Sequence, residues 1–517
     1  MNPGRVLACV AAISLGRPLG HLSALTAQCP DGSAPPCRAA RVDAGRKPGV
    51  VPNSVAVLYF DNLSRDTADA YLADGLTEEL IARLGQVERL TVKSRFAVRR
   101  YRGASTDDPA TVGRVLGVTH LVTGSVRRSG TRLRVTVELM RAAGGDREWG
   151  DQYDRTEADF LAVEEDVARR VATVLAGRLL PTEQARLSVR SAYNAAAYDH
   201  FLRGNYYLAR RDPLSLRRAI EEYDVAVRLD PRFSPALARQ ASAYEQLFNR
   251  LAAGIGDSLL ARGLDLAERA LRQDSASSDA WMAIGQSLEW RHPRDFAGVI
   301  EASSRAVALD PRNAEARHEL GVHLSMVGRD SAAAAEFRAE LAEDPTRGVA
   351  YFQLAHLAHL ARQEEEAECL LDSALADQPG SVDIYAQRAW VRLRVGKVED
   401  AGRDAETALR LASGADRRVA RYGEAALVLV DLAAGDSSGA RARAERLTSG
   451  PPDPVPTFWA GASAITLAAV GRPDDALGVL EQYPRGPRLW RILRRPEFDR
   501  LRSSPRFQRI VEESRPR

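Results

Sequence analysis

Between residues 195 and 483, apolar side chains recur at the three- and four-residue spacing of amphipathic helices, and this pattern itself repeats. Three prolines, Pro311, Pro345 and Pro379, lie 34 residues apart, and each follows a helical stretch within a similar sequence (ALDPRNAEA, AEDPTRGVA and ADQPGSVDI). Proline breaks a helix, so each of them marks a turn between two helices. The period predicts a series of helical hairpins of one design.

Small residues occur in each unit where two antiparallel helices must approach closely, and larger residues fill the spaces between units. The small set is Gly321, Ala355 and Ala389 in first helices with Ala333, Ala367 and Ala401 in second helices, and the larger set includes Tyr351, Tyr385, Phe337 and Leu371. This pattern resembles the tetratricopeptide repeat, whose hairpins stack into a superhelix with a concave binding surface. We expect the array over residues 195–483 and short capping helices over 484–517.

Residues 54–180 have a different pattern, in which short strands and helices are mixed. The segments 120–128 and 132–141 alternate apolar and polar residues on either side of Gly130, as an antiparallel hairpin does. Further strands are predicted at 55–60, 90–94 and 148–153, and helices at 72–84, 109–116 and 160–180. The sequence therefore predicts a multidomain protein, with a small α/β (α+β) N-terminal domain followed by an all-α tetratricopeptide-repeat superhelix. Proteolysis near residues 181–195 is expected to leave two stable fragments.

Four short motifs in this N-terminal part are specific: FDNLS, ADGLTEEL, GSVRR and WGDQYDR. Together they resemble the TolB amino-terminal-like domain, which is related to the FlgO domain and is often followed by tetratricopeptide repeats. The whole arrangement is similar to that of exported repeat proteins of the Gemmatimonadota type. Tyr59 departs from the family, which usually has proline there. The resemblance implies an accessory or interaction module over residues 54–180.

The first 27 residues look like an export signal. Arg5 precedes an apolar stretch at 6–16 that is too short to span a bilayer, and cleavage after Ala27 fits the sequence. The segment 28–53 is expected to be a flexible linker containing Cys and Pro. Export to the periplasm or cell envelope follows. The alternatives are lipidation at Cys29 and an uncleaved segment that anchors the protein to the membrane.

Two of the four cysteines, Cys29 and Cys37, enclose the short sequence CPDGSAPPC. In an oxidising compartment they are expected to form a disulfide, since Asp-Gly and Pro-Pro supply the bends of a small loop. The alternatives are a metal site, for which no further ligand lies nearby, and two unpaired thiols. Cys369, within a repeat helix, is expected to stay reduced.

Composition argues against nucleic-acid binding and against catalysis. The chain has 517 residues, 27% of them charged, with a formal net charge of +3, and short arginine runs such as Arg494–Arg495 are read as solvated faces. No nucleophile elbow, phosphate loop, zincin helix or EF-hand loop occurs. Asp61, Asn62, Asp74, Asp151 and Asp154 could share a pocket, but turns, caps and pairing with Arg127 or Arg128 explain them better. We expect no enzyme activity and no cofactor.

The predicted partner-binding groove comes from positions 2, 5, 9 and 12 of each first helix, which line the concave side of similar arrays. These positions include Gln286, Glu289, Glu315, His318, Phe352, His356, His359, Asp383, Trp390 and Leu393. Phe352 and Trp390 are expected to anchor a protein or peptide partner, with the three histidines donating or accepting hydrogen bonds around them. Two alternatives stay open: His356 and His359 could hold a metal, and Trp390 could pack between repeats.

Two functional classes are consistent with these features. The favoured one is a non-enzymatic scaffold of the cell envelope that binds a protein partner through its repeats. The other is a membrane-anchored signalling or sensor protein whose repeats bind a ligand or regulator.

Overall fold

The structure, a computed structural model, describes residues 52–516 except 104–106, 157–158, 189–192, 252–255, 292–295, 413–416 and 450–460. The predicted export signal, nearly all of the linker and the Cys29–Cys37 disulfide lie outside the described residues. Among the helices that are described, none is both long enough and apolar enough to cross a membrane.

The N-terminal domain is built on a mixed sheet with strand order β3-β1-β4-β5-β6, with β2 (Asp61–Asn62) beside β4. β1 (Ser54–Val57) pairs in parallel with β3 (Thr91–Val92) and with β4 (His120–Ser129). β5 (Arg132–Arg141) and β6 (Arg147–Thr156) continue the sheet as an antiparallel meander. The predicted hairpin is confirmed, and β6 extends the third predicted strand at both ends. β1 ends three residues earlier than expected.

Helices cover both faces of this sheet. α1 (Ala70–Leu84) and α4 (Phe160–Ala176) pack on the face that carries Val135 and Val137 of β5. α2 (Arg95–Val98) and α3 (Pro109–Leu116) pack with Ala56 and Leu121 in a smaller cluster on the other face. α3 has the predicted bounds because Asp108 caps its N-terminus, accepting a hydrogen bond from the Thr111 backbone N–H, and Gly117 ends it in a left-handed conformation.

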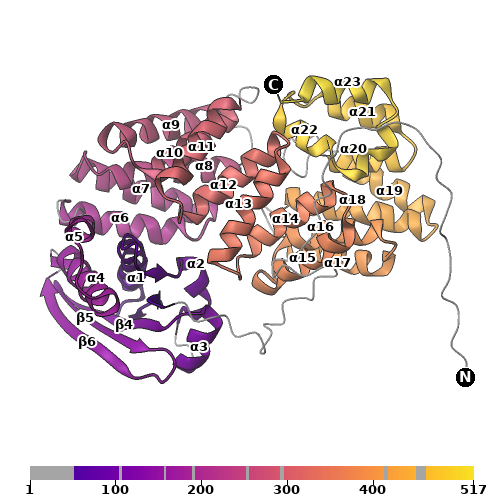
Figure 1. Cartoon of the computed structure of the whole chain (residues 1–517). Helices are drawn as coiled ribbons and strands as arrows, with labels where there is room; N and C mark the ends of the chain where they lie inside the picture. The colour runs from indigo at the N-terminus through magenta and orange to yellow at the C-terminus, as the bar shows by residue number, and fades with distance from the viewer. Residues whose placement is uncertain are drawn as a thin grey trace, which may run out of the picture.

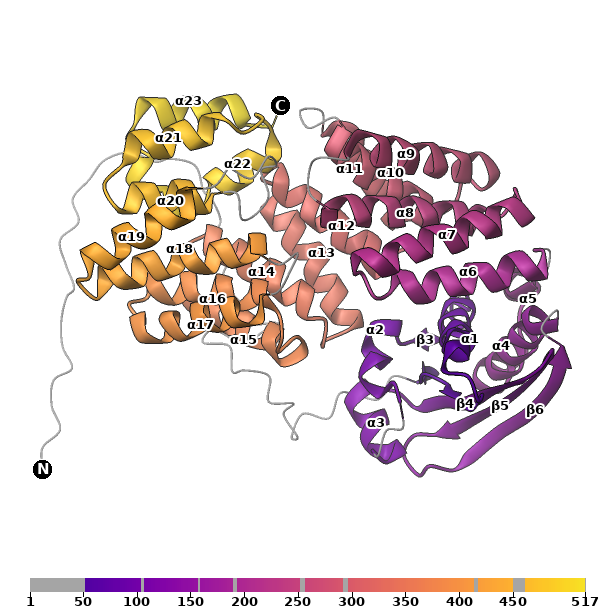
Figure 2. The same ribbon diagram turned by 180° about the vertical axis from the view of Figure 1, so that it is seen from behind.

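Helical hairpins follow from residue 195 to residue 481 and stack side by side (Figures 1 and 2). The two helices of each hairpin pack on one another, and each second helix packs on the first helix of the next hairpin, as the 34-residue period predicts. The hairpins are α6 (Ala195–Leu208) with α7 (Pro213–Leu229), α8 (Ser234–Leu251) with α9 (Gly256–Gln273), α10 (Ser278–Arg291) with α11 (Ala297–Leu309), α12 (Ala314–Met326) with α13 (Asp330–Glu343), α14 (Gly348–Leu360) with α15 (Glu364–Asp377), α16 (Val382–Arg394) with α17 (Val398–Leu411), α18 (Arg417–Ala433) with α19 (Ser437–Thr448), and α20 (Ala462–Ala469) with α21 (Pro473–Glu481).

Glycine appears in first helices where an aromatic ring of the second helix crosses. A Cβ atom at Gly321 would lie 2.6 Å from the Phe337 ring, and one at Gly204 would lie 2.4 Å from the Tyr223 ring. Ala355 and Ala389 occupy the equivalent position in later hairpins and are fully buried. The small residues predicted from the repeat are therefore the contact points between paired helices.

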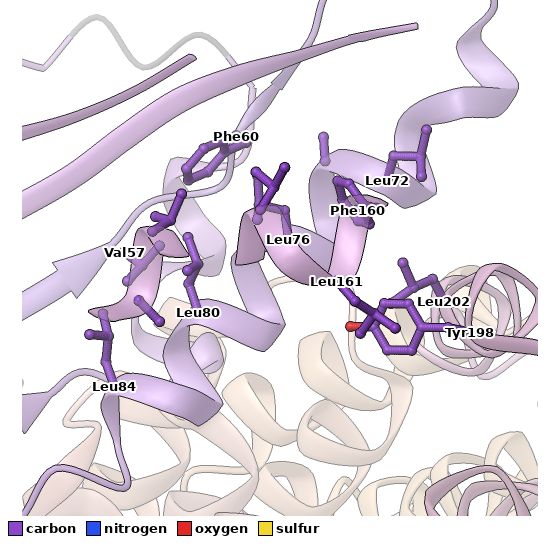
Figure 3. Packing of buried hydrophobic residues seen from close by; sticks show 14 of the residues in the cluster. Val57, Phe60, Leu72, Leu76, Leu80, Leu84, Phe160, Leu161, Tyr198 and Leu202 are labelled. Atoms are coloured by element: carbon purple, nitrogen blue, oxygen red, sulfur yellow. The ribbon is translucent and has the colours of Figure 1, made fainter. Parts of the chain in front are cut away.

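The sheet domain and the first hairpins share one apolar core. Figure 3 shows Leu76 and Leu80 of α1 and Leu161 of α4 in the same cluster as Tyr198 and Leu202 of α6. Gly75 permits the approach of α6, since a Cβ atom there would lie 2.8 Å from a Leu202 methyl carbon. Polar contacts cross the same boundary: the Tyr198 hydroxyl donates to Glu164 Oε2 at 2.7 Å. The change of sequence pattern near residue 190 is therefore not matched by a break in the packing.

After the last hairpin the chain turns back toward the middle of the array. After α21 come α22 (Pro487–Leu493), a short 3₁₀ segment (Pro496–Leu501) and α23 (Pro505–Ser514). At the opposite end of the array, α5 (Pro181–Ser188) lies between the sheet domain and the first hairpin. Figures 1 and 2 both show α22 between α12 and α20. The predicted C-terminal helices are present, and they pack against α12 as well as on the end of the array.

Candidate partner-binding surface

The C-terminal segment from α22 to the 3₁₀ segment touches the predicted groove residues. We call the surface formed by α10, α12, α14 and α16 the inner face. His359 of α14 and Glu289 of α10, both predicted from the repeat, contact this segment. Two of the predicted groove positions therefore contact a stretch of polypeptide that belongs to the same chain.

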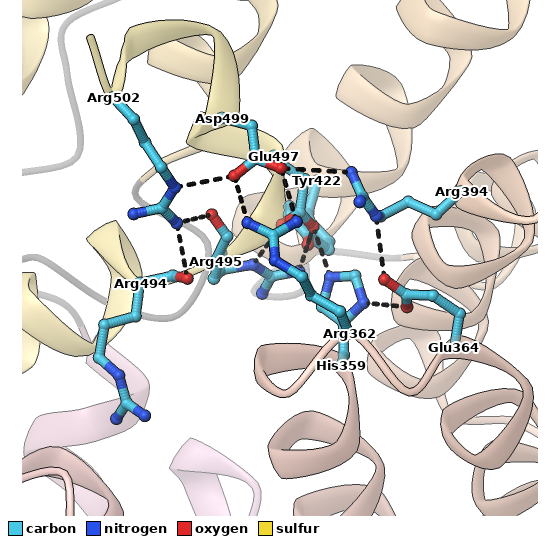
Figure 4. Close-up of polar contacts among 10 residues, drawn as sticks. All are labelled: His359, Arg362, Glu364, Arg394, Tyr422, Arg494, Arg495, Glu497, Asp499 and Arg502. Carbon is cyan, nitrogen blue, oxygen red and sulfur yellow. Dashed lines mark hydrogen bonds and ion pairs between the residues drawn. The ribbon is translucent and has the colours of Figure 1, made fainter. Parts of the chain in front are cut away.

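His359 lies between two carboxylates, and this arrangement requires a charged imidazole. Its Nδ1 is 2.6 Å from Glu364 Oε2 and its Nε2 is 3.1 Å from Glu497 Oε1, as Figure 4 shows. Ionised carboxylates only accept hydrogen bonds, so both ring nitrogens must donate. Burial opposes the charge, but Glu497 and Glu364 outweigh it and raise the pKa of His359.

Glu497 is the centre of this buried cluster. Besides His359, its Oε1 accepts hydrogen bonds from the Tyr422 hydroxyl at 2.9 Å and from Arg495 Nη2 at 2.7 Å. Burial disfavours the ionised form, but Arg495 and His359 lower the pKa of Glu497 far below its usual range. The Arg495 guanidinium also lies 4.7 Å from the centre of the Tyr422 ring. The prediction that Arg494–Arg495 form a solvated face is wrong for Arg495, which is 1% exposed.

Two more ion pairs surround this cluster near the surface. Arg362 makes a bidentate contact with Asp499, at 2.6 Å to each carboxylate oxygen, and Arg502 Nε lies 2.8 Å from the same carboxylate. Figure 4 shows dashed lines from both arginines to Asp499. Arg362 and His359 belong to α14 and its C-terminal turn, so these contacts join the C-terminal segment to the middle of the array.

Trp390 does not anchor a partner, because it is a core residue. It is 1% exposed, its ring stacks on Tyr422 with 4.9 Å between ring centres, and its Nε1–H donates to the Tyr422 carbonyl at 3.1 Å. This corrects the anchor prediction and agrees with the alternative that Trp390 packs between repeats. Leu393, one turn further on, is partly buried against the same cluster.

Glu289 is held in a buried polar site on α10. Arg488 Nη2 lies 2.5 Å from Glu289 Oε1, and His323 Nε2 lies 3.3 Å from Oε2. Although burial opposes ionisation, Arg488 and then His323 lower the pKa of Glu289. The Arg488 guanidinium also sits 3.2 Å from the centre of the Trp290 ring, a cation–π contact. Glu289 was expected to be open to a partner, and it is instead buried under Arg488.

Gln286 and His356 are buried as well, which also differs from the expectation of an open groove. Burial, with Arg491 and Arg495 as neighbours, lowers the pKa of His356 well below its usual value. Its imidazole is therefore neutral near pH 7. Phe352 is half-buried and packs against an apolar cluster in the middle of the array, to which Leu354 and Leu357 of α14 belong. These positions do lie on first helices as predicted, but the C-terminal segment and neighbouring helices exclude water from most of them.

The N-terminal domain covers the inner face at another point, around Glu315 of α12. Arg95 of α2, in the N-terminal domain, lies 3.8 Å from Glu315 Oε1, and Arg211, in the turn between α6 and α7 of the array, lies 2.9 Å from the same oxygen. Burial of Glu315 disfavours its ionised form, but the positive charges of Arg211, Arg347 and Arg95 outweigh this effect and lower the pKa of Glu315 far below its usual value. His318, one turn away, has a pKa lowered to about 4 by burial and by Arg347.

Asp151 and Asp154 of the sheet domain each lie beside an arginine of a neighbouring element. Asp154 pairs with Arg134 at 2.8 Å, and Asp151 lies 3.7 Å from Arg170. The predicted pairing with Arg127 or Arg128 is therefore wrong for both, and Arg128 instead contacts Asp69 at 3.2 Å. Over the described residues no group of three or more His, Cys, Asp or Glu side chains is arranged to hold a metal ion.

The sequence reasoning missed the residues that fill the inner face. Arg488, Arg491 and Arg494 recur every third residue in RLWRILRR, which places them on one side of a helix, and that spacing was a usable signal. Glu245 of α8 and Glu319 of α12 were also missed, although each interacts electrostatically with Arg488. Glu319 lies outside the four positions used to predict the groove, whereas Glu245 is at position 12 of its unit, the same position as Glu289, and could have been found from the repeat.

No protein-family model matches the chain. A protein of Rhizobium meliloti (strain 1021) named "Putative adenylate cyclase 3" is 31% identical over 245 residues, which are 47% of this chain and 41% of that protein. The chain thus spans about two fifths of the length of this curated relative.

Solved structures with similar folds include tetratricopeptide proteins. A thermophilic tetratricopeptide protein of Thermus thermophilus matches with 18% identity and a TM-score of 0.33, covering 38% of this chain and all of that one. The tetratricopeptide protein YrrB, described as having an unusual peptide-binding site, matches with 23% identity and a TM-score of 0.26 over 39% of this chain and 92% of its own. The Cut9–Hcn1 assembly matches with 11% identity and a TM-score of 0.43, over 69% and 63% of the two chains.

Proposed function

We propose that this protein is a non-enzymatic interaction scaffold whose tetratricopeptide array binds a segment of another protein on its inner face. The observation that carries the proposal is that the array already holds a peptide-like segment, residues 487–502, through side chains of α10, α13 and α14. A surface that can surround one short helical segment of this chain is suited to a similar segment of a partner.

Photo-crosslinking in the native cell tests this proposal. A photo-reactive amino acid at Phe352, which is half-buried on the first helix α14, should form covalent adducts with a partner protein. The same amino acid at Leu309, exposed at the end of the second helix α11, is the matched control. Adducts that form equally at both positions, or at neither, would argue against the inner face as the binding surface.

The N-terminal domain is proposed to act as a second interaction module of the TolB amino-terminal-like type. Support comes from the four motifs in the sequence and from a mixed sheet covered by α1 and α4. We further propose export to the cell envelope, with cleavage after Ala27. Sequencing the N-terminus of the mature protein tests this, and an intact Met1 would favour the membrane-anchored alternative.

A signalling role is the second candidate, and the similarity to a protein named as an adenylate cyclase favours it. In that case the chain would sense a ligand or regulate a partner instead of performing the cyclase reaction itself. The purified chain with ATP and Mg²⁺ or Mn²⁺ is expected to produce no cyclic AMP above a heat-denatured control. Measurable cyclic AMP formation would contradict the non-enzymatic proposal.

A further inference from the structure

α22 is amphipathic in an unusual way, because its polar side faces the rest of the protein. Leu489, Ile492 and Leu493 pack into the C-terminal apolar cluster. The opposite side carries Arg488 and Arg491, three residues apart, and Arg494 follows at the same spacing just after the helix. These arginines are directed at the inner face, so the contact between α22 and the array is dominated by charge.

Each arginine meets a defined polar group on a different first helix or turn. Arg488 contacts Glu289 of α10 at 2.5 Å, and Arg491 Nη2 donates to Gln353 Oε1 of α14 at 3.0 Å. Arg494 pairs with Asp330 at the start of α13 and donates to the Ser325 carbonyl at 3.4 Å. The three contacts reach three neighbouring hairpins, with the contact of Arg494 to the α12–α13 hairpin lying between those of Arg488 and Arg491 in the order of the array.

The Arg488 subsite has the features of a built arginine pocket. Glu289 supplies the carboxylate, and the Trp290 ring supplies a flat surface 3.2 Å from the guanidinium carbon. Glu319 of α12 adds negative potential from the next hairpin. Burial, together with repulsion from Glu319 and Glu289, raises the pKa of Glu245 to about 8. The Glu245 carboxyl is therefore mostly protonated near pH 7, and Glu289 is the carboxylate that holds Arg488.

Contacts of this kind can be exchanged. Burying a charge pair brings little net stability, because the desolvation penalty offsets most of the attraction, whereas leaving one partner buried alone is costly. The acidic subsite therefore needs an arginine, but the arginine need not come from α22. An external helix must compete with the tethered segment, whose effective concentration is roughly in the millimolar range.

We propose that the inner face recognises an arginine-bearing helix of a partner protein, with arginines at every third position, and that α22 occupies this site in cis. This inference rests on the proposed scaffold function and specifies the chemistry of the partner. The charge complementarity seen with α22 selects an arginine-rich helix over an acidic or purely apolar one. The partner helix displaces the arginine side of α22, while its apolar side stays in the C-terminal core.

Peptide binding to the full chain tests the proposal. The probe is a fluorescent peptide of residues 485–503, and the control peptide has glutamine in place of its arginines. In the triple variant Arg488→Ala, Arg491→Ala, Arg494→Ala, the probe should bind at least about 10-fold more tightly than in the parent protein, because its own arginines no longer compete. Adding Glu289→Gln to that variant should weaken binding at least about 10-fold, and raised salt should weaken it further.

Circular dichroism and gel filtration establish whether the triple variant is folded. A folded variant that binds the probe no better than the parent, or that binds the control peptide equally well, overturns the proposal. If the triple variant does not fold, hydrogen exchange on the parent protein replaces it: millimolar probe should increase exchange in residues 487–495. Unchanged exchange at saturating probe would overturn the proposal.

The results of photo-crosslinking and of peptide binding together distinguish a failure of this inference from a failure of the proposed scaffold function. Crosslinked partners that lack an arginine-bearing helix would remove the inference and leave the scaffold proposal intact. Specific probe binding without any partner adduct at Phe352 would support the subsite chemistry and count against the scaffold function.

Discussion

At the scale of single residues, His359 shows how burial and charge compete. Its two carboxylate partners hold it in the charged form despite exclusion of water, whereas His356, three residues earlier, faces arginines and is neutral. Two histidines on one helix face thus have opposite charge states because of their neighbours.

The stability of the protein should fall as the pH rises through the elevated pKa of His359. An unfolded histidine titrates near about 6.5. Since the folded pKa is higher, the contribution is fully present below the unfolded value and is lost as the folded histidine deprotonates. Denaturant unfolding of the parent and of His359→Gln between about pH 5.5 and 9 measures the contribution of His359 to the unfolding free energy. In the variant, the fall of the unfolding free energy with rising pH that His359 causes should be absent.

His318 provides the matched control, because its pKa is lowered to about 4. Below about pH 6.5 the unfolded state binds a proton that the folded state does not, so stability should fall as the pH drops toward the folded pKa. His318→Gln should therefore change the profile only on the acid side. A change above about pH 7 in this variant, or none in His359→Gln, would contradict the assignment.

Trp390→Ala should destabilise the array instead of causing a selective binding defect. Removing a fully buried indole costs about 3–5 kcal/mol. Trp390→Phe keeps a ring against Tyr422 but loses the hydrogen bond to its carbonyl, and should cost about 1–3 kcal/mol. Thermal unfolding of both variants checks the order. A stable Trp390→Ala protein would make Trp390 a candidate anchor again.

At the scale of elements, the repeat depends on close approach of paired helices. Phe337 of α13 fits against α12 only because residue 321 has no side chain. The same position holds alanine in the next two hairpins, where the facing side chain is Leu371 or Ala405 instead of a ring. The size of the residue at this position of the first helix thus depends on the side chain of the second helix that packs over it.

Gly321→Ala should lower the unfolding free energy by about 1–3 kcal/mol, because the added methyl group meets the Phe337 ring at 2.6 Å. Gly478→Ala is the control: it lies within α21, and a Cβ atom there meets nothing within 4 Å. Improved helix propensity should make that change stabilising by about 0.5–1 kcal/mol. Chemical denaturation measures both, and equal effects would mean that the two sites do not differ in packing.

Much of the element pattern could be predicted from the sequence. α3 and β5 have the predicted bounds because a capping aspartate, a glycine and strict alternation are local signals. The occupied inner face could not be predicted in the same way. The repeat period indicates which positions turn inward, but a segment far along the chain decides whether those positions meet solvent.

At the scale of the whole molecule, both ends of the described chain fold against the array. The sheet domain shares its core with α6 and α7, and the C-terminal segment contacts α10, α12, α13 and α14. The array is thus closed at two points of its inner face, which couples distant parts of the sequence.

A protease site inserted at residues 189–192 should allow cutting without separating the halves. The two fragments are expected to co-elute in gel filtration, because Leu202 and Tyr198 remain in the core of the sheet domain. This modifies the expectation of two independently stable fragments. Leu202→Asp with the same cut is the comparison, and it should release them. Separation of the fragments without the substitution would show that the shared core does not hold the parts together.

The sequence by itself determined the fold class, the hairpin period and the places where helices must touch. Those properties follow from local spacing of apolar, small and helix-breaking residues, which acts over a few turns of chain. The tertiary structure alone decided that Trp390 is core, that His359 is charged, and that the inner face is filled by arginines of α22. Burial and charge depend on which distant segments meet, and no local pattern contains that information.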